Sequence, residues 1–325
     1  MKNSSNTNVP LLIAITFDLD PDHFDSSTSS NYKYDIPTWK SIEKGVPVIL
    51  DSLENFTDSV GNSLKATWFV RADGQIADLF GNPAAMFEKY RETLDNLCKL
   101  EHEIAWHPHL YKKEGRGWLQ ENNSQMLAKQ LKDTYKDILN YNYTPTSIRV
   151  GENYFSSTIL STIEKLGILY DSTSMPGRKR DDNERLFNWE CAMQSPYYPS
   201  RDDYRLPEEG RKKLLEIPLS MLPIKTTYDK EAYLRYVDLT FHYSLIYPAL
   251  GILLSHQPYL VTVSHPGVLL YGSDQKKHGL LNFSIENFKK NINQIIQHCN
   301  QIERPFHFVT LSNLGEQAKR RMITI

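Results

Sequence analysis

The sequence has 325 residues, of which 40% are hydrophobic and 23% are charged, a composition typical of one large globular domain or two small ones. Lysine and arginine total 37 against 39 acidic residues, so the net charge of -2 argues against nucleic acid or an anionic membrane as a partner. The three cysteines lack paired spacing, which argues against a disulfide framework or a thiolate zinc site.

The beginning of the chain, MKNSSNTNVP, is polar and lacks the apolar stretch of a secretory signal. The longest apolar run near the middle, 245–254, is interrupted by a proline and a glycine and is far shorter than the ~20 residues that span a bilayer. We therefore expect residues 1–9 to be flexible and the protein to be cytoplasmic, without a membrane span.

Short apolar runs alternate with longer amphipathic segments, which is the pattern of βα units around a parallel sheet. Strands are predicted at 11–17, 65–70, 102–106, 146–150, 215–219, 259–264 and 306–310. Helices are predicted at 38–59, 84–99, 122–140, 156–166, 231–246, 284–301 and 312–321. The segment 175–213 has weak periodicity and is predicted to be a long excursion across one face. Its aromatic residues indicate that it is ordered: Trp189, Tyr197, Tyr198 and Tyr204.

The first predicted strand leads into a cluster of acidic residues. The continuous apolar and β-branched run 11–17 is typical of a strand covered on both faces. Several charged residues follow it: Asp18, Asp20, Asp22, His23 and Asp25. Like charges near one strand end are costly unless something positive lies among them, so the cluster favours a bound cation. A solvated, Asp-rich turn is the alternative.

Two histidines follow the strand predicted at 102–106. His107 and His109 are two residues apart, so their side chains point the same way in an extended backbone, which Pro108 favours. Two neutral imidazoles and one carboxylate are a common zinc set, and three protein ligands leave the open position that catalysis needs. We therefore predict a metal site, most consistent with Zn²⁺, that faces the Asp-x-Asp pair. His102 is predicted to be a packed strand residue instead.

Arg149 and His265 also lie at strand ends. Arg149 is either a surface cation or the partner of a carboxylate, a strong and oriented pairing. His265 is either a core histidine or a proton-transfer residue, expected on the side of the pocket opposite the acids. Because the carboxyl ends of strands converge in a parallel barrel, these residues can meet in one pocket with the acids and the histidine pair.

The order of these motifs resembles the polysaccharide deacetylase family, also called the chitooligosaccharide deacetylase homology domain or carbohydrate esterase family 4. The motifs run from about residue 10 to 320: ITFDLD, KATWFV, EHEIAWHPH, IRVGENYF, LEIPLS, VTVSHPG and FHFVTLSNLGE. The resemblance implies an α/β fold, a distorted (β/α) barrel, with residues 10–325 as a single catalytic domain that includes the excursion at 175–213.

The resemblance also implies roles for the strand-end residues. Asp18 would be the general base, Arg149 its partner and His265 the general acid, while Asp20 and His107 would bind the metal. The family's second histidine ligand usually lies four residues after the first, where this chain has Tyr111. His109 or another group must therefore be the third ligand.

Substrate contacts are predicted around the same pocket. Trp189 matches the tryptophan that typically walls the substrate pocket in the family, and the oxyanion donor would be a main-chain N–H within 152–154. Tyr154, Tyr198 and Arg201 are further predicted substrate-binding residues, because tyrosines stack on pyranose rings and arginines hold acidic or phosphate groups.

The predicted function is metal-dependent removal of an N-acyl group, most often acetyl, from an amino sugar or glycan precursor in surface polysaccharide biosynthesis or modification. Two alternatives stay open. One is an amidohydrolase on a small non-sugar amide or imide, as in the allantoinase-like relatives of the family. The other is a non-catalytic carbohydrate-binding relative that has lost its metal.

Overall fold

A computed structural model of the chain describes residues 9–21, 38–115, 117–182, 186–226, 229–267 and 284–323. Its centre is an eight-stranded sheet with the strand order β10-β7-β6-β3-β2-β1-β13, in which β14 also pairs with β1. All the pairings in this sheet are parallel. The strands are β1 (Leu11–Leu19), β2 (Ala66–Arg71), β3 (Glu103–His107), β6 (Ser147–Ile148), β7 (Tyr170–Asp171), β10 (Leu215–Glu216), β13 (Tyr259–Val261) and β14 (Phe306–Phe308).

The two edges of the sheet are linked by the segment that follows β10. Ser220 donates its main-chain N–H to the Val261 oxygen of β13 at 3.0 Å, and Leu219 donates to the Ser174 oxygen, beyond β7, at the same distance. The sheet is therefore curled, and the predicted distorted (β/α) barrel is confirmed. β1 lies at its centre, and all nine of its residues are buried.

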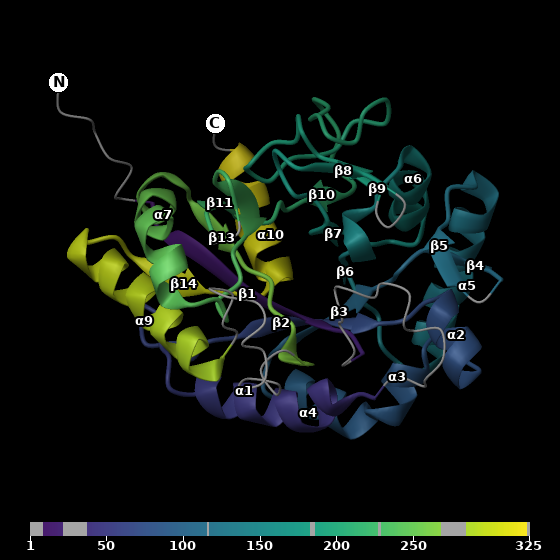
Figure 1. Ribbon diagram of the computed structural model, residues 1–325, viewed down its shortest axis with the longest axis horizontal. Helices are drawn as coiled ribbons and strands as arrows, with labels where there is room; N and C mark the ends of the chain where they lie inside the picture. Colours follow the sequence, from purple (N-terminus) through teal and green to yellow (C-terminus); the bar gives the residue numbers. More distant parts are fainter. Residues whose placement is uncertain are drawn as a thin grey trace.

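Helices surround the sheet (Figure 1). In that view α1, α4 and α3 lie below it, α9 and α7 at the left, and α2 and α5 at the right. The helices are a π-helical turn η2 (Ser41–Gly45), α1 (Val46–Leu53), α2 (Gly74–Phe80), α3 (Ala85–Lys89), α4 (Arg91–Lys99), α5 (Ser124–Asn140), a 3₁₀ turn η3 (Gly151–Asn153), α6 (Ser157–Lys165), α7 (Tyr243–His256), α9 (Ile285–Gln301) and α10 (Leu311–Ile323). None of the helices in the described ranges is long and apolar enough to cross a membrane.

Within the described ranges, three antiparallel hairpins extend from this barrel. They are β4 (Tyr111–Glu114) with β5 (Gly117–Gln120), β8 (Lys179–Asp181) with β9 (Leu186–Asn188), and β11 (Met221–Ile224) with β12 (Tyr233–Tyr236). The β8–β9 hairpin belongs to the excursion at 175–213. Its neighbours Trp189 and Tyr204 pack with Phe155 in an aromatic cluster. The described part of the excursion is therefore ordered, as its aromatic content predicted.

The seven predicted strands are all present, although β6, β10, β13 and β14 are shorter than expected. The helix predicted at 84–99 is two helices, which are separated at Tyr90. The helix predicted at 231–246 is wrong in its first half. Residues 233–236 form β12, and Asp238 then accepts the Thr240 N–H in a turn, so the helix begins only at Tyr243.

Candidate active site

The first strand places two carboxylates on one side of its carboxyl end. Asp18 lies in β1 and Asp20 follows it by two residues, so both side chains point the same way in extended backbone. Both are buried, between β2 on one side and the segment after β13 on the other. The other members of the predicted acidic cluster, Asp22, His23 and Asp25, lie outside the described residues.

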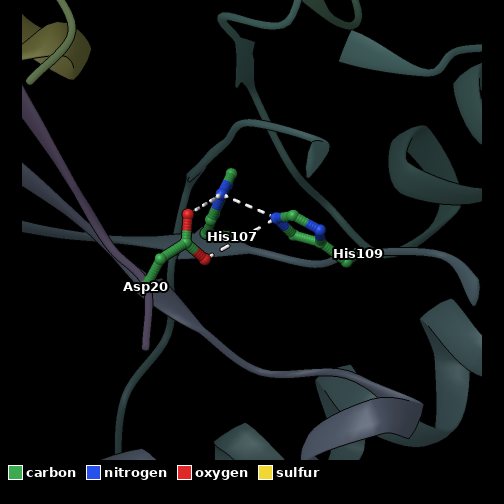
Figure 2. Close-up of side chains that lie close together, drawn as sticks. All are labelled: Asp20, His107 and His109. Atoms are coloured by element: carbon green, nitrogen blue, oxygen red, sulfur yellow. Dashed lines mark hydrogen bonds and ion pairs between the residues drawn. The ribbon is translucent and has the colours of Figure 1, made fainter. Parts of the chain in front are cut away.

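Asp20, His107 and His109 bring three potential metal-ligand atoms together (Figure 2). The Nε2 atoms of the two histidines lie 3.2 Å apart, and each is 3.6 Å from one oxygen of the Asp20 carboxylate. Ligand bonds of about 2.0–2.1 Å at tetrahedral angles place neighbouring ligand atoms about 3.3 Å apart. The 3.6 Å distances run to Oδ2 for His107 and to Oδ1 for His109, so the three side chains lie close to the spacing that a tetrahedral ion with one open position requires.

The other ring nitrogen of each histidine has a partner. His107 donates its Nδ1–H to the main-chain oxygen of Arg149 at 2.7 Å, which leaves the Nε2 lone pair facing Asp20. His109 Nδ1 lies 3.2 Å from the Tyr111 hydroxyl, which donates to Glu152 at 3.4 Å. Metal-bound histidines usually have their second nitrogen fixed in this way, so the rings are oriented as ligands.

Gly151 makes room for the ring of His109. A Cβ atom at this position would lie 2.0 Å from His109 Cδ2 and 2.3 Å from Nε2, which is far too close for atoms that are not bonded to each other. The main chain of η3 can approach the ring only because this residue has no side chain. Tyr111, where the family usually has its second histidine ligand, lies behind His109 and hydrogen-bonds to it.

The charges at the site favour a cation. Burial alone would raise the pKa of Asp20, but His107, His109 and Arg71 hold that pKa well below its ordinary value. Burial alone would lower the pKa of His107, but the carboxylates of Asp18 and Asp20 raise it. Asp20 is therefore held as a carboxylate, which is the form in which it can bind a divalent ion.

Arg149 holds Asp18, as the resemblance implied. Its Nη1 donates to Asp18 Oδ1 at 2.7 Å and to Thr16 Oγ1 at 2.9 Å, and its Nε donates to the Ser172 oxygen at 2.9 Å. The guanidinium is buried, and its Cζ atom lies 4.1 Å from the centre of the Phe69 ring. Asp18 thereby has one oxygen fixed, while Oδ2 lies 3.9 Å from His107 Nε2.

His265 lies beside the acids. Its Nε2 is 3.7 Å from Asp20 Oδ2 and 4.0 Å from Asp18 Oδ2, and its side chain is 22% exposed. The expectation that it lies on the opposite side of the pocket is wrong, because β13 pairs directly with β1. Asp238 is buried next to it and accepts a hydrogen bond from Ser264 Oγ at 2.8 Å. Burial raises the pKa of Asp238, and the charge of His265 opposes that rise.

The predicted substrate-binding residues have other neighbours. Trp189 is 1% exposed and donates from Nε1 to the Asn153 oxygen at 2.8 Å, one layer behind the pocket. Tyr154 is buried, and Tyr198 is partly buried against the core. Arg201 is exposed and its main-chain N–H donates to Glu208. None of the four lies in the pocket lining among the described residues, so their contact with substrate stays a prediction.

Several groups at the site were not predicted from the sequence. Besides the predicted residues, which include Glu152 and Asn153 of the oxyanion range, the pocket is lined by Val150, Leu219, Tyr236 and Val263. Below it, Arg71 and Asp73 are buried and contact Asp20 and His109. Arg71 ends β2, so a polar residue at a strand end, the signal that identified Arg149, could have identified it too. His102, by contrast, accepts the Ala66 N–H at 2.9 Å as a packed residue, as predicted.

No family model matches the sequence, and no curated protein sequence is significantly similar to it. Solved structures are similar in fold. One is a protein from Mycobacterium smegmatis that has been assigned as a polysaccharide deacetylase. The superposition covers 98% of this chain and 92% of that protein, with a TM-score of 0.54 and 15% sequence identity.

Two more distant matches have lower scores. A peptidoglycan deacetylase variant from Bacillus subtilis matches 96% of this chain over 93% of its own, with a TM-score of 0.41 and 14% identity. A family 4 carbohydrate esterase from Streptomyces lividans matches 93% of each chain, with a TM-score of 0.39 and 12% identity. The similarity to the Mycobacterium protein shows that this chain shares that protein's fold, as the resemblance of the motifs implied.

Proposed function

We propose that this protein is a metal-dependent hydrolase that removes an N-acyl group, most often acetyl, from an amino sugar. One observation carries the proposal. A three-ligand site with metal spacing lies next to two groups outside the ligand set, Asp18 and His265, each with an atom within 4.0 Å of the Asp20 or His107 side chain. A purely structural metal site has four protein ligands and needs no base or acid beside it.

Hydrolysis of an amide requires a nucleophile, stabilisation of an oxyanion and a proton for the departing nitrogen. A divalent ion bound by Asp20, His107 and His109 would supply an activated water and polarise the acyl carbonyl. Asp18, fixed by Arg149, takes the proton of the attacking water on Oδ2. His265 donates a proton to the nitrogen as the carbon–nitrogen bond breaks, so the products are a carboxylic acid and a free amine.

The oxyanion donor belongs to the turn that follows Arg149. Tyr154 already donates its N–H to the Gly151 oxygen at 3.3 Å. Glu152 and Asn153 line the pocket and have positive φ of 54° and 55°, so we place the oxyanion donor on the main chain of these two residues. Backbone donors held in this way stabilise a developing negative charge without reorganising.

For the metal we favour zinc, because two imidazoles and one carboxylate are a common zinc set. For the substrate, we favour a glycan precursor or its short oligosaccharide over a long polymer. Among the described residues, the pocket combines apolar side chains such as Leu219 and Val263 with the polar Glu152, Asn153 and Tyr236, which suits a single sugar ring. The cysteines are free, with Cys98 and Cys191 exposed, which fits a reducing compartment such as the cytoplasm.

The test is a substrate panel with zinc-loaded protein. N-acetylated amino sugars, free and nucleotide-linked, short chitin oligosaccharides, insoluble chitin and peptidoglycan, and a cyclic imide are each incubated. Released amine and acetate are measured for the sugars, and ring opening to the amide acid is measured for the imide. We expect equal amounts of both products from a soluble sugar substrate, and their loss with Asp18→Asn. Turnover of the imide alone would support the allantoinase-like alternative. Tight sugar binding without acyl release would support a non-catalytic module.

A further inference from the structure

We infer that Arg71 and Asp73 are positioning residues that hold Asp20 and His109 at the metal site before the ion binds. This inference rests on the proposed function, because it concerns the same site. The two residues come from the end of β2 and the start of α2. Neither lies in the predicted ligand set, and both are 1% exposed.

Arg71 orients the Asp20 carboxylate. Its Nη1 donates to Asp20 Oδ1 at 2.9 Å, its Nη2 donates to Gln75 Oε1 at 2.6 Å, and its Nε donates to Asp73 Oδ2. A planar guanidinium that makes three directed hydrogen bonds has one orientation, so it fixes the rotation of the carboxylate that it contacts. Asp20 Oδ2 then faces His107 Nε2, 3.6 Å away.

Asp73 holds the main chain of His109. Its Oδ2 accepts the His109 N–H at 3.0 Å, while its Oδ1 accepts the N–H groups of Gln75 and Ile76 at 2.9 and 3.0 Å. One carboxylate thus caps α2, binds Arg71 and fixes the position of the segment that follows β3. The side chain of His109 is set by this anchor on its main chain and by Tyr111 on its ring.

Together these contacts join the two ends of the metal site. Asp20, Arg71, Asp73 and the His109 main chain form a continuous chain of hydrogen bonds. The segments that it connects are far apart in the sequence, since 89 positions separate Asp20 from His109. A site whose ligands are already in place loses less conformational freedom when it binds an ion. Hydrogen bonds made to the ligands by residues that do not touch the metal therefore affect the metal affinity strongly.

The experiment separates positioning from general stability. Arg71→Lys keeps the charge but lacks the planar set of donors. Asp73→Ser keeps a good N-cap for α2 but has no second oxygen for Arg71 and His109. Arg304→Lys is the matched control, because Arg304 is also buried but donates to the Val9 and Leu254 main-chain oxygens, at the other end of β1. Zinc dissociation constants are measured by chelator competition, and thermal unfolding is measured on the metal-free proteins.

We expect Arg71→Lys and Asp73→Ser to weaken zinc binding by about 10–100-fold. Arg304→Lys should lower the unfolding temperature without changing the zinc affinity. If the wild-type protein binds zinc tightly and either folded site variant binds it equally well, the inference is wrong and the proposed function is unaffected. If the wild-type protein binds neither zinc nor cobalt, both are wrong.

Discussion

The Nδ1–H of His107 donates to the main-chain oxygen of Arg149 at 2.7 Å, so one hydrogen bond connects a proposed metal ligand to the residue that holds Asp18, the proposed base. The side chain of the same arginine donates to Asp18 at 2.7 Å. The short strand β6, which ends just before Arg149, thus sets both the ring orientation of His107 and the position of Asp18. This relationship explains why residues from β1, β3 and β6 act as one site.

His109→Ala should abolish retention of zinc when the loaded protein is dialysed against a mild chelator. Its Nε2 is one of the three ligand atoms, and Asp20 and His107 alone would hold the ion weakly. His102→Ala is the control, because His102 contacts the Ala66 main chain. Metal content after dialysis is measured by elemental analysis. If the His109→Ala protein kept one ion per chain, another group such as Tyr111 or Asp22 would have to be the third ligand.

Gly151→Ala should weaken zinc binding by at least ~10-fold. The added Cβ would lie 2.0 Å from His109 Cδ2, so the ring must move away from the ligand position. Gly74→Ala serves as the matched change, since a Cβ there meets nothing within 4 Å. Chelator competition gives the two affinities. Equal affinities for the two variants would show that His109 does not need its present position.

Asp18→Asn and His265→Ala should each reduce turnover by at least ~100-fold while zinc content stays at the wild-type level. Asp18 must be ionised and His265 protonated, so the wild-type rate should be bell-shaped with pH, and His265→Ala should lose the alkaline limb. Steady-state rates of amine release across pH measure this. A His265→Ala enzyme with both limbs and wild-type rates would contradict its assignment as the acid.

A buried pair of acids beneath the pocket predicts a pH effect on stability. Burial raises the pKa of Asp171 to about 6 and that of its neighbour Glu216 well above the ordinary value. Above about pH 4 the unfolded chain releases protons that the folded protein keeps on these two acids. The free energy of unfolding therefore falls as the pH rises from about 4 through the pKa values of the folded pair.

Glu216→Gln should remove most of this dependence. Its free energy of unfolding, measured with urea, should fall less between pH 5 and pH 8 than that of the wild-type protein. Asp133→Asn, an exposed change on α5, controls for the loss of one acid. A Glu216→Gln effect of the same size at both pH values would contradict the buried-pair explanation.

The sequence predicted the parts of the fold that depend on continuous apolar runs. β1, β2 and β3 lie within two residues of their predicted positions, because strands buried on both faces leave a clear pattern. β7, a strand of two residues, was not predicted, and residues 233–236 were taken for part of a helix, whereas they form β12 by pairing with β11. Pairing between distant strands is not encoded in local periodicity.

The site was predicted where single polar residues end a strand, as with Asp18, His107 and Arg149. It was not predicted where the role depends on a neighbour in space. Arg71 also ends a strand, so the same signal could have identified it, but only the structure shows that its partner is Asp20, 2.9 Å away. Gly151 reads as an ordinary turn residue until the His109 ring occupies the space next to it.

The most direct test of the central claim is a zinc titration of metal-free protein, with ion content and amine release measured in the same samples on the best sugar substrate from the panel. We predict that the rate rises in proportion to bound zinc and reaches its maximum at one ion per chain, and that Asp18→Asn binds the same ion without activity. Full deacylation by metal-free protein, or one bound ion with no acyl release from any substrate in the panel, would contradict the account.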